Sequence, residues 1–349
     1  MNIIAKDLID LMNAWAPQNL AESWDHPGLQ VGNSQQVVHK VLVSLDLTEE
    51  NVELAIEKGA EMIISHHPFL FKGIHTLDLS TYKGKVIEKL IKHDILAFAA
   101  HTNLDTAQGG VNDALAAVLE LSDVTGLVPA KKHQMYKLAA YVRPADARAF
   151  YHHVKETYPG EAGHYYLLDD EDDDLSKLAK MEINGEEEVL PFLLADLKTY
   201  CGAVHYDIYP LTNGGTQEYM GRMGDLPSAM DGKDALLYIK EKLGIPDLRY
   251  AGNAHGTVRR VAVLGGAGSE FAPLAKAKGA DLYLTGDWKY HEAQDASRLG
   301  LLIADGGHFY TERVIIPYLA ERLRKAAEEK SWDLEVLEDR RAKDIFSHL

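Results

Sequence analysis

The chain has 349 residues, of which 46% are hydrophobic and 26% charged, and its formal net charge is −17. This length predicts two or three domains with a sizeable buried interior. No apolar run approaches the roughly 20 residues needed to cross a bilayer, and the negative charge disfavours general nucleic-acid binding. A small anionic substrate remains open, because bound metal ions can dominate the local field.

Two features of the sequence predict a cytoplasmic protein. The first predicted helix, around residues 4–15, carries Asp7 and Asp10 among its apolar positions. A secretory signal would hold an uninterrupted apolar stretch there. The single cysteine, Cys201, cannot form an internal disulfide, which agrees with a reducing compartment. It also excludes a cysteine-ligated zinc site, so any metal must be held by nitrogen and oxygen.

An internal repeat organises the chain. Residues 41–65 align with residues 261–285 at a constant offset of 220 without a gap, and eight of the 25 positions are identical. Each copy is predicted to form a strand, a helix of about ten residues, a Gly-Ala turn and a second strand. The predicted strands cover residues 41–45, 62–64, 261–264 and 282–284.

A later apolar strand in each half ends near a histidine that has a carboxylate four residues further on. The first half gives His101 and Asp105 after the strand at 95–100. The second half gives His308 and Glu312 after the strand at 301–304. Two such pairs at corresponding places indicate paired halves of one site.

The segment between the copies has a different character and is predicted to be a separate module. Its expected order of strand, helix, two strands, helix and strand suggests a small ferredoxin-like domain. The acidic run Asp169 to Asp174 favours a solvated loop over a cation site, because consecutive acids cannot all face one ion. The predicted elements cover residues 137–142, 144–157, 164–168, 180–183, 190–200 and 204–209.

Five residues form the predicted metal site. His66 and His67 follow a buried strand, at the edge of an α/β sheet where ligands bind. Adjacent histidines on extended backbone diverge, which suits them to two neighbouring ions. His308 and Glu312 share one face of a predicted helix, so Glu312 is the preferred bridge and Asp105 the other carboxylate. These ligands suit two divalent ions, with zinc expected in the isolated protein and iron, manganese or nickel as alternatives.

Several nearby residues allow two interpretations. His101 is either a sixth ligand or a group that orients a ligand or the substrate. Asp287 and His291, also four apart, either hold a ligand or contact the substrate, or they serve as helix-cap and surface residues. The turn at residues 265–268 lacks the full phosphate-binding pattern, so a tight connecting turn is favoured. His101 and His291 are the predicted catalytic residues, acting in proton transfer.

Five motifs occur together in this chain: residues 23–32 (SWDHPGLQVG), 65–68 (SHHP), 101–105 (HTNLD), 285–287 (TGD) and 307–312 (GHFYTE). Together they resemble the Nif-three-like family, also called dinuclear metal centre hexameric proteins and GTP cyclohydrolase 1 type 2 homologs. The resemblance covers about residues 1–130 and 215–349. His26 stands where asparagine is usual, which affects no expected ligand.

The resemblance implies the same five metal ligands. It also implies a toroidal homohexamer with metal sites that face an internal cavity, and an inserted domain similar to the PII and CutA fold. The insert is short in its middle and rich in acids, so a ligand-binding role found elsewhere is not carried over. The predicted fold class is therefore α/β, with two duplicated α/β halves (1–130 and 215–349) that form one metal-binding unit. An inserted ferredoxin-like α+β domain (131–214) separates them.

The leading functional hypothesis is a metal-dependent hydrolase in which the metals activate water for attack on a small nucleotide-like or phosphate-bearing substrate. The family name suggests GTP ring opening. The alternative is a non-catalytic protein for metal storage, delivery or regulatory assembly. An open coordination position would favour hydrolysis, whereas a site closed by protein ligands would favour storage.

Overall fold

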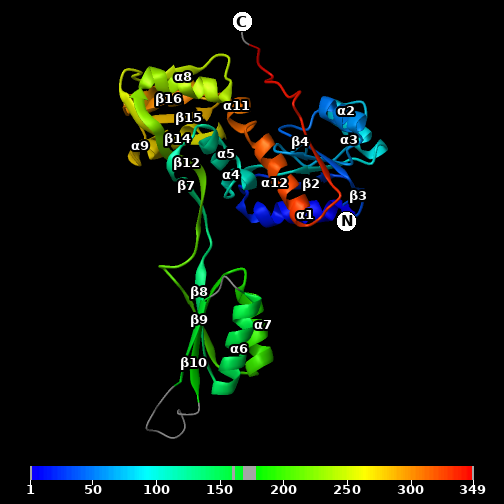
Figure 1. Ribbon diagram of the computed structural model, residues 1–349, viewed down its shortest axis with the longest axis vertical. Coiled ribbons are helices and arrows are strands. Elements are labelled where there is room, and N and C mark those ends of the chain that lie inside the picture. Colours follow the sequence, from blue (N-terminus) through cyan, green and yellow to red (C-terminus); the bar gives the residue numbers. More distant parts are fainter. Residues whose placement is uncertain (1, 159–161, 168–177, 348–349) are drawn as a thin grey trace. The chain divides into compact units, whose positions relative to one another are not determined.

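The computed structural model describes residues 2–158, 162–167 and 178–347. The chain forms two compact units, one from Met1–Ala130 with Tyr219–Leu349 and the other from Lys131–Glu218 (Figure 1). The smaller unit is thus inserted into the sequence of the larger one. Within the described residues, no helix is both long and apolar enough to cross a membrane.

One sheet of the larger unit has five strands in the order β17-β4-β5-β6-β2, and all but β17 come from the first half. Strands β17, β4, β5 and β6 run parallel, and β2 pairs antiparallel with β6. A separate short pair, β1 with β3, lies near the N-terminus. The elements are β1 (Ile3–Ile4), β2 (Gly28–Val31), β3 (Val37–Val38), β4 (Lys40–Ser44), α2 (Glu49–Lys58), β5 (Met62–Ser65), α3 (Tyr82–Lys92), β6 (Leu96–Ala99) and β17 (Glu335–Glu338).

The second half builds a six-stranded sheet in the order β13-β16-β15-β14-β12-β7. Strands β14, β15 and β16 run parallel, whereas β13 and β12 pair antiparallel with β16 and β14. The elements are β7 (Ser122–Lys132), β12 (Gln217–Asp231), β13 (Arg249–Ala251), β14 (Thr257–Ala267), α9 (Ala272–Ala277), β15 (Leu282–Gly286), α10 (Tyr290–Arg298) and β16 (Leu302–Asp305).

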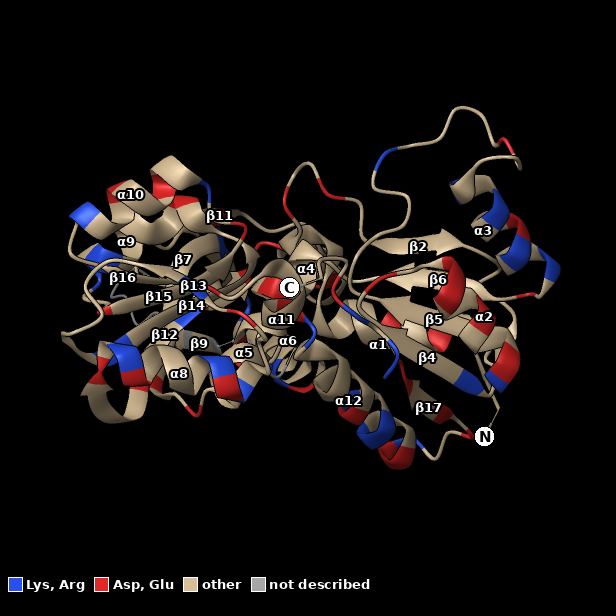
Figure 2. Cartoon of the chain, turned by 90° about the horizontal axis from the view of Figure 1, so that it is seen from above, with Lys and Arg blue, Asp and Glu red and all other residues tan. Residues whose placement is uncertain are grey.

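Helices and apolar side chains join the two sheets. Figure 2 shows α4, α5, α11 and α12 between them. One buried cluster takes Val41 and Val43 from β4 together with Val261 and Val263 from β14. Leu42, on the opposite face of β4, packs into the cluster that includes residues of α2 and α3. This alternation is the period of two expected of a strand covered on both faces. The remaining helices of this unit are α1 (Ala5–Trp15), α4 (Thr102–Thr106), α5 (Val111–Val118), α8 (Gly232–Leu243), α11 (His308–Glu312) and α12 (Ile315–Glu329).

The smaller unit is a four-stranded antiparallel sheet in the order β11-β8-β10-β9 with two helices. Its own apolar core includes Phe150 of α6, Leu193 of α7 and Met181 of β10. Residues on β10 alternate between buried and half-buried, so one face of the sheet carries this core. The elements are β8 (Met135–Val142), α6 (Pro144–Thr157), β9 (Ala162–Leu167), β10 (Ala179–Glu186), α7 (Leu190–Cys201) and β11 (Tyr206–Pro210).

The predicted elements coincide with observed ones to within a few residues, with one clear difference. The helix expected after the first repeat strand is α2, which has ten residues. The corresponding segment of the second copy is a 3-10 turn (Ser269–Phe271) followed by α9, which has only six residues. Pro273 lies in the first turn of α9, where proline is favoured, and so fixes the start of a shorter helix. The acidic run Asp169 to Asp174 lies outside the described residues.

Because the smaller unit has its own core, Phe150→Ala should destabilise it alone. Phe150 is fully buried, and removing such a ring costs about 3–5 kcal/mol of unfolding free energy. Hydrogen exchange resolved by peptide should show faster exchange in α6 and β10 and unchanged exchange in β4 and β14. The matched control is Phe192→Ala, because Phe192 is 64% exposed in the same unit. Equal loss of protection in both units would contradict separate cores.

Candidate metal centre

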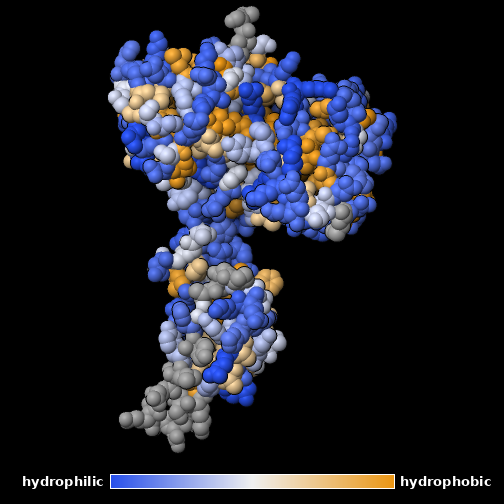
Figure 3. All heavy atoms as spheres, in the orientation of Figure 1, coloured by the Kyte–Doolittle hydropathy of each residue, from blue (hydrophilic) through white to orange (hydrophobic). Residues whose placement is uncertain are grey.

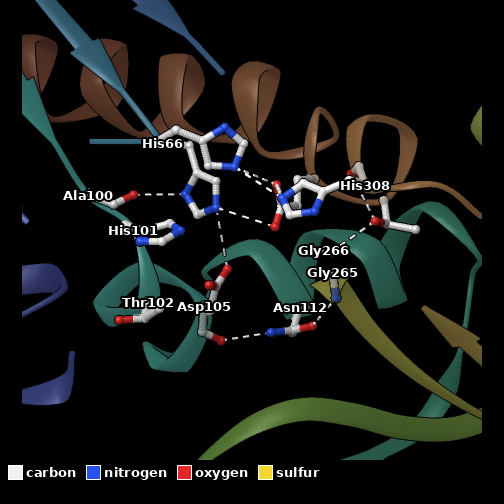
Figure 4. Close-up of polar contacts among 12 residues, drawn as sticks. His66, Ala100, His101, Thr102, Asp105, Asn112, Gly265, Gly266 and His308 are labelled. Carbon is white, nitrogen blue, oxygen red and sulfur yellow. Dashed lines mark hydrogen bonds and ion pairs between the residues drawn. The ribbon is translucent and has the colours of Figure 1, made fainter. Parts of the chain in front are cut away.

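The predicted ligands lie at the carboxyl ends of parallel strands in both sheets. His66 and His67 follow β5, and Asp105 lies on α4 after β6. His308 and Glu312 lie on α11 after β16. Open α/β sheets bind ligands at this edge, because helices and loops that follow the strands meet there. Figure 4 shows His66, Asp105 and His308 directed toward one another at this point.

One group of ligand atoms is buried and comes from His66, Asp105 and Glu312. Nε2 of His66 lies 3.6 Å from Oδ1 of Asp105 and 3.8 Å from Oε1 of Glu312. Exposed fractions are 0% for His66, 8% for Asp105 and 3% for Glu312. Among the described residues, neither His66 Nε2 nor Asp105 Oδ1 has a hydrogen-bond partner. Buried polar atoms are seldom unpaired, so this pair fits a cation bound between them.

A second group comes from His67, His308 and the other oxygen of Glu312. Oε2 of Glu312 lies 2.8 Å from Nε2 of His67 and 3.0 Å from Nε2 of His308. The two imidazole nitrogens are 3.3 Å apart. The side chains of His67 and His308 are 23% and 39% exposed, so this group is the more open one.

The spacing in both groups suits metal ions. Ligand atoms around a tetrahedral ion with bonds of about 2.0–2.1 Å lie roughly 3.4 Å apart. The buried group has separations of 3.6 and 3.8 Å, and the open group has 2.8, 3.0 and 3.3 Å. Glu312 contributes one oxygen to each group, which is the arrangement of a bridging carboxylate. The residues present therefore fit a pair of divalent ions.

Each ligand histidine is held through its Nδ1 atom. His66 Nδ1 lies 2.8 Å from the carbonyl oxygen of Ala100. His67 Nδ1 lies 2.7 Å from Asp46, and His308 Nδ1 lies 2.8 Å from Asp287. Such partners fix the ring and its tautomer, so that Nε2 is left available to a metal ion. Asp287 thus contacts a predicted ligand, His308.

Sequence reasoning missed Asp46 as the partner of His67. Asp46 follows β4 by two residues, at the same sheet edge as His67. Its position after a strand was therefore an available signal. The signal was weak, because the chain has 53 acidic residues and nothing in the local pattern singles out this one.

Burial and mutual contacts shift the pKa values of the clustered residues. Burial opposes charge on His67, but its hydrogen bonds to Asp46 and Glu312 outweigh burial and raise its pKa to about 10. Burial likewise opposes charge on His308, while Glu312 and Asp287 raise its pKa to about 9. Burial raises the pKa of Asp105 to about 7. Burial would also raise the pKa of Glu312, but the surrounding histidines hold it well below its usual range.

The glycine-rich end of β14 makes room for Glu312. Gly266 has a φ of 69°, and a Cβ there would collide with Oε1 of Glu312. Its N–H donates to Thr311 Oγ1 at 3.0 Å, and the N–H of Gly265 donates to Asn112 at 2.9 Å. Protein groups therefore satisfy the two amides that a phosphate would need, and residues 265–267 form the irregular end of strand β14 rather than the predicted turn.

Asn112 ties the two halves together at the cluster. Its side-chain amide donates to the carbonyl oxygen of Asp105 at 2.9 Å, while its carbonyl accepts from Gly265. Asn112 is fully buried. Through Asn112, the backbone of Asp105 is fixed to the end of β14, which packs on Glu312 (Figure 4).

His101 lies beside the cluster and is held by Asp25. Its Nδ1 is 2.9 Å from Asp25 Oδ1, and its ring centre is 5.4 Å from that of His66 and 5.6 Å from that of His67. Burial would raise the pKa of Asp25, but hydrogen bonds from His101 and Thr102 outweigh it and lower the pKa to about 2. Ligand atoms of His66, His67 and His101 lie within 4.8 Å of one another, so a ligand role also fits.

His291 is not brought to the cluster by any described contact. It lies on α10, is exposed, and its ring packs against that of Tyr290 at 5.3 Å. Within the described part of the chain, no hydrogen bond or ion pair joins it to the ligand residues. Its role in proton transfer stays a prediction from spacing.

A cavity of about 480 Å³ opens beside the more exposed group. His67 and His308 line it, together with their partners Asp46 and Asp287. Two cations, Arg249 and Lys343, also line it, and Arg249 forms an ion pair with Asp305. A small molecule in this cavity would therefore contact the open group directly.

Metal binding should release protons. An imidazole must be deprotonated to ligate, and His67 and His308 have pKa values of about 10 and about 9. Adding Zn²⁺ at pH 7 should release about two protons per chain, and affinity should rise as pH rises from 6 to 8. Calorimetry in buffers of different ionisation enthalpy measures this release. His67→Ala should release fewer protons, while the exposed control His93→Ala should match the wild type. Affinity that does not change with pH would contradict the assignment.

The chain matches the family described as Duf34/NIF3 (NGG1p interacting factor 3) over residues 3–344. A Bacillus subtilis protein named GTP cyclohydrolase 1 type 2 homolog is 35% identical over 358 residues, which covers 96% of each chain. The crystal structure of a Bacillus cereus protein related to NIF3 is 32% identical, with a TM-score of 0.86 over 99% of both chains. That of a Staphylococcus aureus protein is 30% identical, with a TM-score of 0.89 over 99% of both chains. This chain therefore belongs to the Duf34/NIF3 family.

Proposed function

We propose that this protein is a metal-dependent hydrolase that uses two divalent ions on a small nucleotide-like or phosphate-bearing substrate. The observation that carries the proposal is the pair of ligand groups that share Glu312, one buried and one open to a cavity. A buried group gives a firmly held ion, and an open group leaves room for water and substrate.

The five residues divide into ligands for two ion positions. His66, Asp105 and Oε1 of Glu312 would hold one ion, and His67, His308 and Oε2 of Glu312 the other. Zinc suits these ligands, as do iron, manganese and nickel. Ions bound there supply Lewis acidity, which lowers the pKa of water toward about 7 and stabilises negative charge on the substrate.

The protein's own groups would position and move protons. Asp46 and Asp287 orient the imidazoles that face the cavity. Asp25 lies at Nδ1 of His101 and favours the proton there, which leaves Nε2 free to accept one from water. His101 is therefore the preferred general base, and His291 remains a second candidate.

The substrate class rests on two supports. Divalent ions bound at the open group would attract a phosphate into the cavity, whose own lining holds five aspartates against Arg249 and Lys343. The similar Bacillus subtilis protein carries the name GTP cyclohydrolase 1 type 2 homolog, which points to a nucleotide.

Metal storage or delivery is the second candidate function. The burial of His66, Asp105 and Glu312 favours it, because an enclosed ion exchanges slowly and meets no substrate. Exposure of His308 to the cavity favours the hydrolase. We favour the hydrolase because one of the two ligand groups faces the cavity.

We also infer that the two halves of the larger unit arose by duplication. In each half three strands run parallel, and a strand from earlier in that half, β2 or β13, pairs antiparallel with the third of them. The strand order of the smaller unit, β11-β8-β10-β9 with α6 and α7, supports a ferredoxin-like insert. A toroidal homohexamer and a cytoplasmic location remain proposals from the resemblance and the composition.

Glu312→Gln should abolish turnover, because it removes the charge shared by both groups. Zinc-, manganese- or iron-loaded protein should hydrolyse some member of a nucleotide and phosphoester panel. The variant should be slower by more than about a hundredfold and should retain less metal by elemental analysis. Glu321→Gln is the matched control, because the side chain of Glu321 is 77% exposed on α12. No turnover by wild-type protein with any of these metals would count against the hydrolase and favour storage.

A further inference from the structure

Two exposed aromatic side chains stand next to His101, and we call Trp24 and Phe71 the aromatic shelf. Their ring centres are 5.7 Å apart with planes tilted by 53°. Each also meets the His101 ring edge to face, Trp24 at 6.1 Å and 73° and Phe71 at 6.3 Å and 80°. The shelf is thus built around the histidine that borders the metal centre.

The shelf lies one ring beyond the expected metal ligands. The His101 ring is 5.4 Å from that of His66 and 5.6 Å from that of His67. A planar group on the shelf would therefore leave its substituents within reach of the cluster.

Both rings of the aromatic shelf are exposed to solvent. Trp24 is 53% exposed and Phe71 is 39% exposed. The face of the molecule drawn in Figure 3 is mainly hydrophilic, with apolar atoms in separate patches. One exposed ring is ordinary, as Phe192 at 64% shows, but Trp24 and Phe71 touch each other and His101, so together they offer one aromatic surface beside the site. The free ring surface beside the metal centre therefore suits a ligand with an aromatic face.

The backbone beneath the shelf is firmly held. Asp25, the neighbour of Trp24, is 7% exposed and accepts hydrogen bonds from the Thr102 hydroxyl at 2.6 Å and its N–H at 3.1 Å. Leu70, the neighbour of Phe71, donates its N–H to Gln30 at 3.0 Å. Rings on anchored backbone lose little further freedom when a ligand stacks on them.

We propose that the aromatic shelf binds the base of a free nucleotide, so that the substrate of the metal centre is a nucleobase-bearing molecule. That this molecule is the substrate of the metal centre rests on the proposed function, whereas base binding by the shelf does not. Every base offers a face that stacks on an aromatic side chain. A free nucleotide is favoured over a polymer, because the net charge of −17 would repel a nucleic-acid backbone.

Binding to zinc-loaded full-length protein tests the shelf. The probes are the four ribonucleoside 5′-monophosphates and ribose 5-phosphate, which has the same phosphate and no base. At least one nucleotide should bind at least about fivefold more tightly than ribose 5-phosphate. Trp24→Leu and Phe71→Leu should each remove most of that difference and leave ribose 5-phosphate binding unchanged. Trp24→Phe should keep most of the affinity difference between nucleotide and ribose 5-phosphate. A phenylalanine ring can stack on a base, whereas a leucine side chain cannot.

Controls separate the shelf from a structural role. Tyr318→Leu changes an aromatic residue that is 40% exposed on α12 and should bind like the wild type. Zinc content, melting temperature and mass by light scattering should be unchanged in the shelf variants. Equal binding of all probes, or wild-type binding by both leucine variants, would overturn the proposal. A change of oligomeric state in the leucine variants, with no change in nucleotide binding, would instead make the shelf an interface between copies and would also overturn it.

The two proposals can fail separately. Base-dependent binding without turnover would support the shelf and count against the hydrolase. Turnover of a phosphoester that lacks a base, with all probes bound equally, would support the hydrolase and overturn the shelf.

Discussion

The buried carboxylate of Glu312 is the feature on which the rest of the centre depends. It is 3% exposed, and a carboxylate buried in this way must be paired. Its partners come from both halves of the larger unit, with His66 and His67 from the first and His308 from the second. The halves must therefore pack against each other for the charge to be compensated, and the site cannot exist in either half alone.

The surrounding fold holds the halves in that position. The inner faces of β4 and β14 share one apolar core, and Asn112 of α5 accepts a hydrogen bond from Gly265 near the end of β14. Gly266 leaves space for Glu312 where any side chain would collide with it. The smaller unit has a separate core.

Much of this could be predicted because the signals are local. Strand periodicity, the repeat and a four-residue spacing placed the five ligand candidates at strand ends, and the structure brings all five together. His291 shows the limit of that reasoning, since Asp287 and His291 have the same spacing as His308 and Glu312 while α10 leaves His291 exposed. Asp25 and Asp46 could not be chosen, because their roles depend on contacts made only in the folded chain.

Two ions held between the halves are the central prediction, and anomalous X-ray scattering from crystals of zinc-loaded protein tests it most directly. We expect two anomalous peaks per chain, one next to His66 and Asp105 and the other next to His67 and His308, with Glu312 next to both. A peak pattern in which no ion contacts residues of both halves would contradict it.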